Sequence, residues 1–559
     1  MGQIQEDAGP QDDPFVPGTV LLVDVWSTDS HKCHGKHASG KNAEIVLIPP
    51  PSDDPNDPLN WNVSRKSFHL VLICAYTFLL NGLINFYSVA YVGLARDLNT
   101  DFNGLNTGSS MLFLFSGVGA VLWQPIAMKI GRRPVYILGL LIAMVGSILG
   151  ALQSDWGIWV TFNVIWGIGC GPKEGLPQIS LQDTYFAHQI GSKIGYWALS
   201  YAAGAFLTPL VAGYVYVRLS WRWCFWITAI GFGSLSVVLF FALDETLWPR
   251  SFTPTGALAQ PAPSRSVQKV TSIDEGQDKK EVPAGNESEG SYSLVEGLAE
   301  VRMKTYWQSH PIHSWGINPT QKWLDLFLRP YLLASFPPVL WAGVFTGVSV
   351  CWWAAMFTTQ SEFFTTKYHW NGAQVGLTNA GPLIGSVLGT LFAGNISDKY
   401  IIMAARRNNG IREPEQRLIL LFATGMIAAS GLLMYGIGVD RALHWTCPVI
   451  GMGLLGFGFT GSSIIGETYV LDSYRAVAPE SLVLINIFRN VIGMSYVLAM
   501  QPWLNHSGYG NAFIQMMAMC ITIHLSVIPI IIWGKKLRAM TASKYLQMLD
   551  KAEIPRIFA

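Results

Sequence analysis

Charged residues are scarce in this chain: Asp, Glu, Lys and Arg make up only 13% of its 559 residues. Soluble globular domains carry about 25% charged residues, so the composition excludes an ordinary soluble protein. The formal net charge is only +1, which leaves no excess charge to bind nucleic acid or an acidic partner. Apolar and aromatic residues make up 50%, and they gather in blocks of about 20, the length that crosses roughly 30 Å of hydrocarbon. We predict an all-α membrane protein with many spans.

Two other features are missing. Roughly the first 60 residues contain no apolar core, so we expect no cleavable signal peptide. Of the seven cysteines, six lie in apolar runs and only Cys33 lies in a tail, which argues against a disulfide framework. Cys33 lies close to His31, His34 and His37, but this spacing matches no standard zinc site. We interpret the cluster as a solvated stretch and expect no metal.

The apolar blocks fall into two sets of six. They are predicted at residues 67–93, 105–128, 134–152, 156–181, 192–216 and 221–243, and then at 332–359, 372–396, 418–438, 443–469, 481–503 and 511–534. The polar stretch between the sets has too little apolar content to form a core. The predicted organisation is a tail at 1–66, a bundle at 67–243, a partly disordered loop at 244–331, a second bundle at 332–534 and a tail at 535–559.

Basic residues concentrate in alternate loops. The turn after the second span carries Lys129, Arg132 and Arg133, and the turn after the eighth carries Lys399 and several arginines. The loops on the opposite side hold only scattered basic residues. Because positive loops stay on the cytoplasmic side, we predict that both termini and the central loop are cytoplasmic.

Corresponding turns of the two halves carry similar basic stretches, which indicates an internal repeat of the kind that alternating-access carriers use. Several motifs add to this: "DPLNW" before the first span, "GRRPVY" after the second, "WRWCFWI" opening the sixth, "DETLWPR" closing the first half and "GNISDK" after the eighth. The sequence resembles the major facilitator superfamily, and within it the fungal twelve-span drug/polyamine:proton antiporter-like branch. The resemblance implies twelve helices in two pseudo-symmetric six-helix bundles, with a substrate site between them.

The superfamily's loop signature is complete only in the second half. The retained residues are Lys129, Gly131, Arg132 and Arg133 in the first half, and Gly394, Asp398 and Lys399 in the second. In the first half Met128 takes the place of the acid, which the resemblance assigns to a latch between neighbouring helices. We therefore expect the first-half turn to serve mainly in topology.

The predicted fifth span is similar to the glycine series of antiporters, with Gly204, Pro209 and Gly213 at matching positions. Small residues let helices approach closely, and proline permits bending. Plain helix packing explains the same pattern, so an antiporter role and a packing role both stay open.

Two acids stand inside predicted spans. Glu174 ends a small and polar stripe that includes Asn163, and Glu467 ends a stripe with the same offsets that includes Ser463. A charge near a helix centre costs about 2.5–3.5 kcal/mol, so we expect both acids to face the bundle interior, where a proton and a cationic substrate can compete for them. The alternative is that both lie near the ends of their helices and are solvated.

Basic and polar neighbours accompany these acids. Adjacent residues on a helix point about 100° apart and do not pair, so Lys173 either extends toward the membrane surface or faces the cavity, where it would disfavour a purely polycationic substrate. Arg489 and Asn486 match polar positions of the branch. Arg489 lies near Asp472 in the sequence, so we expect it either to neutralise that acid or to contact the substrate.

Three aromatic residues complete the predicted site. Trp352, Trp353 and Tyr201 lie in predicted spans and offer ring faces to an organic cation. Aromatic residues in spans more often simply pack, and that alternative stays open.

These observations predict a secondary transporter that moves a small organic solute across the plasma membrane by alternating access. The leading version is proton-coupled export of a drug-like compound, a polyamine or other organic cation, or a secondary metabolite. We expect a monomer driven by the proton gradient without a cofactor. Proton-coupled uptake and a non-transporting sensor with the same fold remain alternatives. An enzyme is not expected, because the spans contain no nucleophile paired with a base and no metal-ligand set.

Overall fold

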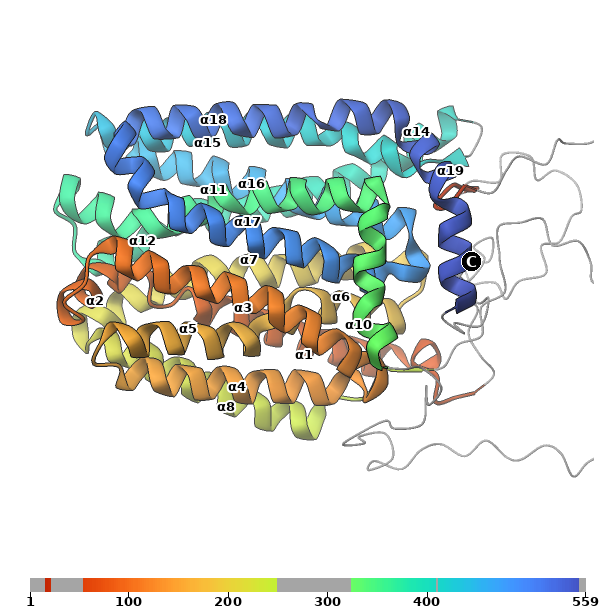
Figure 1. Cartoon of the computed structure of the whole chain (residues 1–559), viewed down its shortest axis with the longest axis horizontal. Helices are drawn as coiled ribbons and strands as arrows, with labels where there is room; N and C mark the ends of the chain where they lie inside the picture. The colour runs from red at the N-terminus through yellow and green to blue at the C-terminus, as the bar shows by residue number, and fades with distance from the viewer. Residues whose placement is uncertain (1–15, 22–53, 249–322, 409–410, 552–559) are drawn as a thin grey trace, which may run out of the picture.

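The computed structural model describes residues 16–21, 54–248, 323–408 and 411–551. Long helices lie side by side along the horizontal axis of Figure 1. At one end of them lie α19 (Val527–Lys551) and, bonded to it, the N-terminal segment 16–21. We call this end the tail side and the opposite end the far side, so that both described ends of the chain lie at the tail side.

The first half contains the helices that form six crossings. They are α1 (Val63–Ile84) with its continuation η3 (Ser88–Ala90) and α2 (Tyr91–Asp97), α3 (Phe102–Lys129), α4 (Arg132–Leu152), α5 (Trp156–Cys170) with η4 (Gly171–Lys173) and α6 (Gly175–Thr184), α7 (Ala187–Arg218), and α8 (Trp221–Ala242). A short helix, η2 (Pro58–Asn60), precedes them.

The second half repeats this arrangement. Its elements are α10 (Trp323–Leu332), η5 (Leu333–Ser335), α11 (Pro337–Tyr368), α12 (Gly372–Leu377), α13 (Ala380–Leu391), the π-helix η6 (Phe392–Ile396), α14 (Ser397–Arg407), η7 (Pro414–Leu420), α15 (Leu421–Asp440), α16 (Thr446–Ser473), η8 (Arg475–Val477), α17 (Ala478–Ser507), α18 (Tyr509–Leu525) and α19. Two short strands, β1 (Val20–Leu21) and β2 (Ile411–Arg412), pair antiparallel at the tail side.

One crossing of the first half is broken. Eleven helical stretches of the described chain are long and apolar enough to cross a membrane, and the twelfth crossing consists of α5 and α6 with η4 between them. Pro172 lies in this break, and proline lacks a backbone N–H and clashes with the preceding turn of a continued α-helix. The prediction of twelve spans in two sets of six is confirmed.

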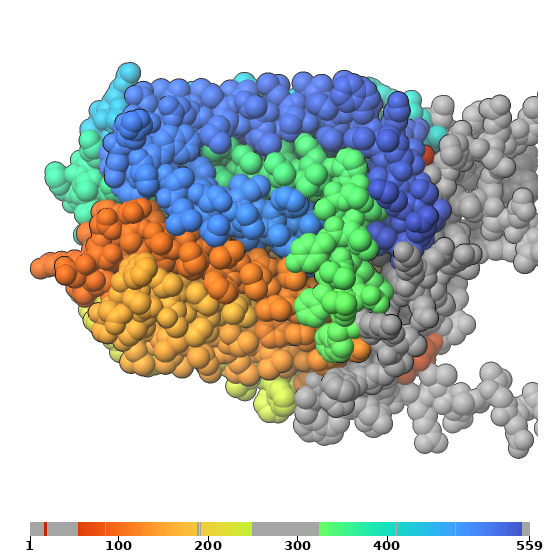
Figure 2. Space-filling view, in the orientation of Figure 1, coloured from red at the N-terminus to blue at the C-terminus, as the bar shows by residue number. Residues whose placement is uncertain are grey.

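The second described end of the predicted central loop is helical, and it forms α10. Figure 2 shows α10, in green, across the boundary between first-half and second-half residues at the tail side, where it contacts α3 and α17. The ammonium of Lys129 lies 4.9 Å from the ring centroid of Trp323 at the start of α10. Residues 249–322 of that loop and the cluster around Cys33 lie outside the described residues.

Helix α7 packs closely against helices of both halves. A Cβ atom at Gly204 would lie 2.3 Å from the carbonyl oxygen of Phe78 in α1, and one at Gly213 would lie 2.5 Å from that of Gly372 in α12. The backbone of Pro209 also faces α12. Because such contacts need residues without bulky side chains, helix packing accounts for the glycine series of the fifth span.

The turn between α3 and α4 is held by acids from elsewhere in the first half. Arg132 Nη2 lies 2.8 Å from Asp183 Oδ2 at the end of α6. The backbone N–H groups of Arg132 and Arg133 donate to the Glu245 carboxylate at 3.0 and 3.2 Å, where the helix dipole favours an anion. Gly131, with φ of +125°, precedes them. The expectation that this turn serves mainly in topology was incomplete. Met128 takes the place of the signature acid, and Asp183 and Glu245, from other parts of the first half, bond to the turn instead.

The corresponding turn of the second half uses its own acid. Asp398 Oδ1 accepts a hydrogen bond of 2.9 Å from Arg417 in η7, which continues into α15. Lys399 is exposed, and Gly394 lies in η6 with no other atom within 4 Å of its Cβ position. The acid of the signature therefore links α14 to the start of the next span.

The two glycines at the start and middle of α7 provide a matched test of this packing. Replacing Gly204 by Ala forces its Cβ against the backbone of α1, and we expect a loss of about 1–3 kcal/mol in stability. Gly195→Ala adds its methyl group where no atom outside its own stretch of helix lies within 4 Å, so it should cause no loss of stability. Melting temperatures of the two purified variants in detergent measure the difference, and equal values would contradict the packing described here.

Candidate functional site

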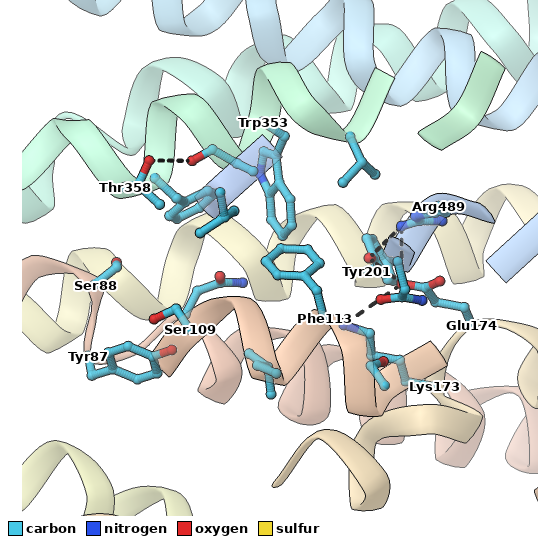
Figure 3. A pocket seen from close by; sticks show the side chains of 18 of the residues that line it. Tyr87, Ser88, Ser109, Phe113, Lys173, Glu174, Tyr201, Trp353, Thr358 and Arg489 are labelled. Atoms are coloured by element: carbon cyan, nitrogen blue, oxygen red, sulfur yellow. Dashed lines mark hydrogen bonds and ion pairs between the residues drawn. The ribbon is translucent and has the colours of Figure 1, made fainter. Parts of the chain in front are cut away.

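A cavity of about 80 Å³ lies between the two halves. Its lining residues are Asn85, Tyr87, Ser88, Tyr91, Ser109, Leu112, Phe113, Ser116, Lys173, Glu174 and Tyr201 from the first half, and Val350, Trp353, Ala354, Phe357, Thr358, Arg489, Asn490 and Val497 from the second. Figure 3 shows that charged groups gather at one end of this cavity and hydroxyl groups at the other. The cavity therefore offers a solute two chemically different ends.

The charged end consists of an arginine held between two glutamates. Arg489 Nη2 lies 3.1 Å from Glu174 Oε1, and its Nη1 lies 3.2 Å from Glu467 Oε1. The Tyr201 hydroxyl donates to Glu174 Oε1 at 3.1 Å and accepts from Arg489 Nη2 at 3.1 Å (Figure 3). Because Glu174 and Tyr201 belong to the first half and the other two to the second, these bonds join the halves.

The break between α5 and α6 turns two adjacent side chains toward the cavity. Lys173 Nζ lies 3.8 Å from Glu174 Oε1, and both residues line the cavity. Of the two positions open for Lys173, the structure has the one that faces the cavity, because the 100° angle between neighbours applies to a continuous α-helix and η4 is not one. A second cation therefore stands beside Glu174.

The four charged groups are buried and balanced. Glu174, Glu467 and Lys173 are each 8% exposed and Arg489 is 6% exposed, so the alternative of solvated acids at helix ends is wrong. Two formal negative charges face two formal positive charges. Burial of ions costs several kcal/mol each unless they are paired and hydrogen-bonded, and this arrangement supplies that pairing.

The partner expected for Arg489 was incorrect. Asp472, at the end of α16, pairs instead with Arg412, and its Oδ1 lies 3.7 Å from Arg475. Arg489 begins the fourth turn of α17, away from the tail side where Asp472 lies, and is level with Glu467. The two residues are close in the sequence, but they lie at different depths in the bundle.

Aromatic rings form the middle of the cavity. Trp353 stacks on Phe459 at 5.5 Å between centroids and meets Phe357 edge to face at 4.8 Å, and Figure 3 shows it close to Phe113. The Trp353 indole N–H is buried and has no hydrogen-bond partner among the described residues. It is therefore free to donate to a solute. Trp352 instead packs against Tyr496, so only the second tryptophan of the predicted pair lines the cavity.

Three predicted polar residues do not line the cavity. Asn163 is fully buried and donates to the Trp159 carbonyl at 2.8 Å, Ser463 has a buried hydroxyl oxygen without a partner in the described chain, and Asn486 is 5% exposed. The stripes therefore end at the site but mostly serve helix packing. Asn490, one turn beyond Asn486, is a lining residue that the same "NIFRN" stretch contained.

Glu362 is a third acid inside the bundle, and the sequence analysis did not predict it. Glu362 is 8% exposed, and its Oε1 accepts a hydrogen bond of 2.9 Å from the Tyr509 hydroxyl. The seventh span was predicted to end at residue 359, whereas α11 runs on to Tyr368, so this acid seemed to lie in a loop. It does not line the cavity.

Hydrogen bonds join the two halves on both sides of the cavity. Toward the tail side, Gln178 Nε2 donates to Glu467 Oε2 at 3.0 Å. Toward the far side, Gln360 Nε2 donates to Ser88 Oγ and Ser361 Oγ to the Val89 carbonyl, both at 3.4 Å.

The charge balance can be tested by removing and restoring it. Arg489→Gln leaves Glu467 buried without its cation, and we expect a loss of about 3–5 kcal/mol in stability. Adding Glu467→Gln restores neutrality and should recover most of that loss. Melting temperatures of the purified variants report this, with Arg441→Gln, at an exposed position, as a control. A double variant no more stable than the single one would contradict the balance.

Comparison with known proteins agrees with this architecture. The Major Facilitator Superfamily pattern matches residues 72–497. The chain is 30% identical to the MFS-type transporter C1271.10c of Schizosaccharomyces pombe, covering 96% of this chain and 94% of that one. It is 29% identical to protein HOL1 of Saccharomyces cerevisiae, covering 96% and 97%, and 26% identical to the MFS transporter cpaT of Aspergillus oryzae, covering 87% and 90%.

Two solved structures share the fold. The proton:xylose symporter XylE superposes with a TM-score of 0.56 at 14% identity, over 84% of this chain and 97% of XylE. The human organic anion transporter MFSD10 superposes with a TM-score of 0.51 at 12% identity, over 85% and 99%. The chain thus belongs to the Major Facilitator Superfamily, as its motifs predicted, and is a membrane transporter rather than an enzyme.

Proposed function

We propose that the protein carries a small organic solute by alternating access and couples its movement to protons at Glu174 and Glu467. The observation that carries this proposal is the guanidinium of Arg489 bonded to a carboxylate from each half. Tail-side opening must separate Glu174 from Arg489 and Gln178 from Glu467. A group that changes the strength of these bonds therefore controls the opening.

A proton is such a group. Protonation of Glu174 removes its charge and with it most of the attraction to Arg489 and Lys173. Opening separates Glu174 from Arg489, and a neutral Glu174 loses less attraction in that step than a charged one, so the protonated form opens more readily. A ligand shifts a conformational equilibrium by its differential affinity for the two states, and a proton with higher affinity for the open state fulfils that requirement.

The lining residues favour a compact amphipathic solute with at most one positive charge. Trp353, Phe113 and Phe357 provide apolar ring surface, and rings of this kind attract an organic cation. Lys173 and Arg489 stand at the charged end and repel a second positive charge. Among the predicted solutes, a drug-like monocation or uncharged metabolite therefore fits better than a polyamine.

We further propose that the tail side is cytoplasmic and that the protein exports its solute across the plasma membrane. The basic turn Lys129–Arg133 and the basic helix α14 (Ser397–Arg407) lie at the tail side, in accordance with the preference of positive loops for the cytoplasm. A single chain contains both halves of the cavity, which supports a monomer, and the proposed cycle needs a proton gradient and no cofactor.

Reconstituted vesicles with a trapped pH-sensitive dye test this function. We expect an aromatic monocation and an uncharged aromatic compound to drive proton movement, and a polyamine and an aromatic anion to drive much less. Glu174→Gln should reduce solute-driven proton movement at least about tenfold, within the usual range of coupling energies, because it cannot take up or release a proton. An imposed pH gradient then shows whether the solute accumulates or leaves.

An ion-paired acid away from the cavity provides the control. Glu413 is half-buried and pairs with the exposed Lys535 at 2.8 Å, and it does not line the cavity, so Glu413→Gln should transport like the unaltered protein. Equal proton movement by Glu174→Gln, Glu467→Gln and the unaltered protein would remove these acids from the mechanism. Absence of solute flux with every compound would instead favour the sensor.

A further inference from the structure

The N-terminal segment 16–21 belongs to the tail before the first half, yet it lies on the second half. Its strand β1 pairs antiparallel with β2, with Val20 opposite Arg412 and Leu21 opposite Ile411. Strand β2 lies in the turn between α14 and η7, which follows the loop signature of the second half. The segment thus adds a strand to a turn of the second half.

A buried arginine anchors the segment. Arg538 of α19 is 0% exposed, and its Nε and Nη2 donate to the two carboxylate oxygens of Glu415, each at 2.8 Å. Its Nη1 donates to the Pro17 carbonyl and, at 3.2 Å, to Thr19 Oγ1. A buried guanidinium is costly unless its donors find acceptors. Without the segment, Arg538 Nη1 loses both of these acceptors.

Gly18 allows the segment to lie directly against the end of α16. It has φ of +80°, and a Cβ at this position would lie 2.7 Å from Ser473 Cα and 2.8 Å from the Asp472 carbonyl oxygen, both at the end of α16. Glycine adopts positive φ without steric cost, and here it also permits the backbones to touch. Position 18 therefore requires glycine for two independent reasons, the positive φ and the close approach of the two backbones.

We propose that the groove formed by β2, the end of α16 and Arg538 is a binding site for an extended peptide, and that segment 16–21 of the same chain is its occupant. Recognition by strand addition combines backbone hydrogen bonds with pockets for particular residues, and here β1, Gly18 and Arg538 supply these parts. The occupied groove connects the tail of the first half to α16, the helix that carries Glu467.

Binding of the segment in trans tests this proposal without any transport measurement, so its failure leaves the proposed function untouched. The probe is a fluorescent peptide of residues 12–24, and the receptor is the chain without residues 1–21, held in lipid nanodiscs. We expect saturable binding by fluorescence anisotropy, with a Gly18→Val peptide at least about tenfold weaker. The unaltered full chain should bind no probe, because its own segment occupies the groove.

Full-length variants keep the test decisive if the truncated chain does not fold. Gly18→Val in the full chain should free the groove and allow the probe to bind. Gly508→Val is the matched control, since Gly508 also has positive φ but has open space around it, and it should bind no probe. Equal binding of the two peptides, no binding to any freed groove, or a dimer of the unaltered chain that Gly18→Val dissociates would overturn the proposal.

Discussion

The bonds between Arg489 and two glutamates determine how the rest of the molecule is arranged. Two carboxylates and two cations lie at the centre of an apolar bundle, where an unpaired charge would be costly. Each half supplies one carboxylate and one cation, Glu174 with Lys173 from the first half and Glu467 with Arg489 from the second. The bond between Arg489 and Glu174 joins these two pairs across the halves.

The broken crossing makes that arrangement geometrically possible. A continuous α-helix would carry Lys173 and Glu174 to different sides, whereas η4 allows both to line the cavity. Broken helices at midplane depth are tolerated in membranes where the irregular backbone is buried in protein or lines a cavity. The interruption at Gly171–Lys173 is thus a feature of the site as much as of the fold.

Hydrophobic run lengths were sufficient to predict the spans, and the cost of an intramembrane charge was sufficient to identify Glu174 and Glu467. The partner of Arg489 could not be predicted in the same way, because it depends on the relative depth of three helices rather than on sequence separation. For the same reason Asp472 was assigned incorrectly. The choice between two positions for Lys173 stayed open because hydropathy does not show where a helix breaks, although Pro172 marked the position.

The neutral total of the central cluster has an electrical consequence. A membrane potential acts on net charge, and moving one elementary charge across about 100 mV is worth about 2.3 kcal/mol. In the proposed cycle, the empty carrier changes conformation without this cluster carrying net charge through the field, because its four charges cancel. With one proton bound the same cluster has one positive charge, so under the proposed coupling the voltage biases the protonated carrier and not the empty one.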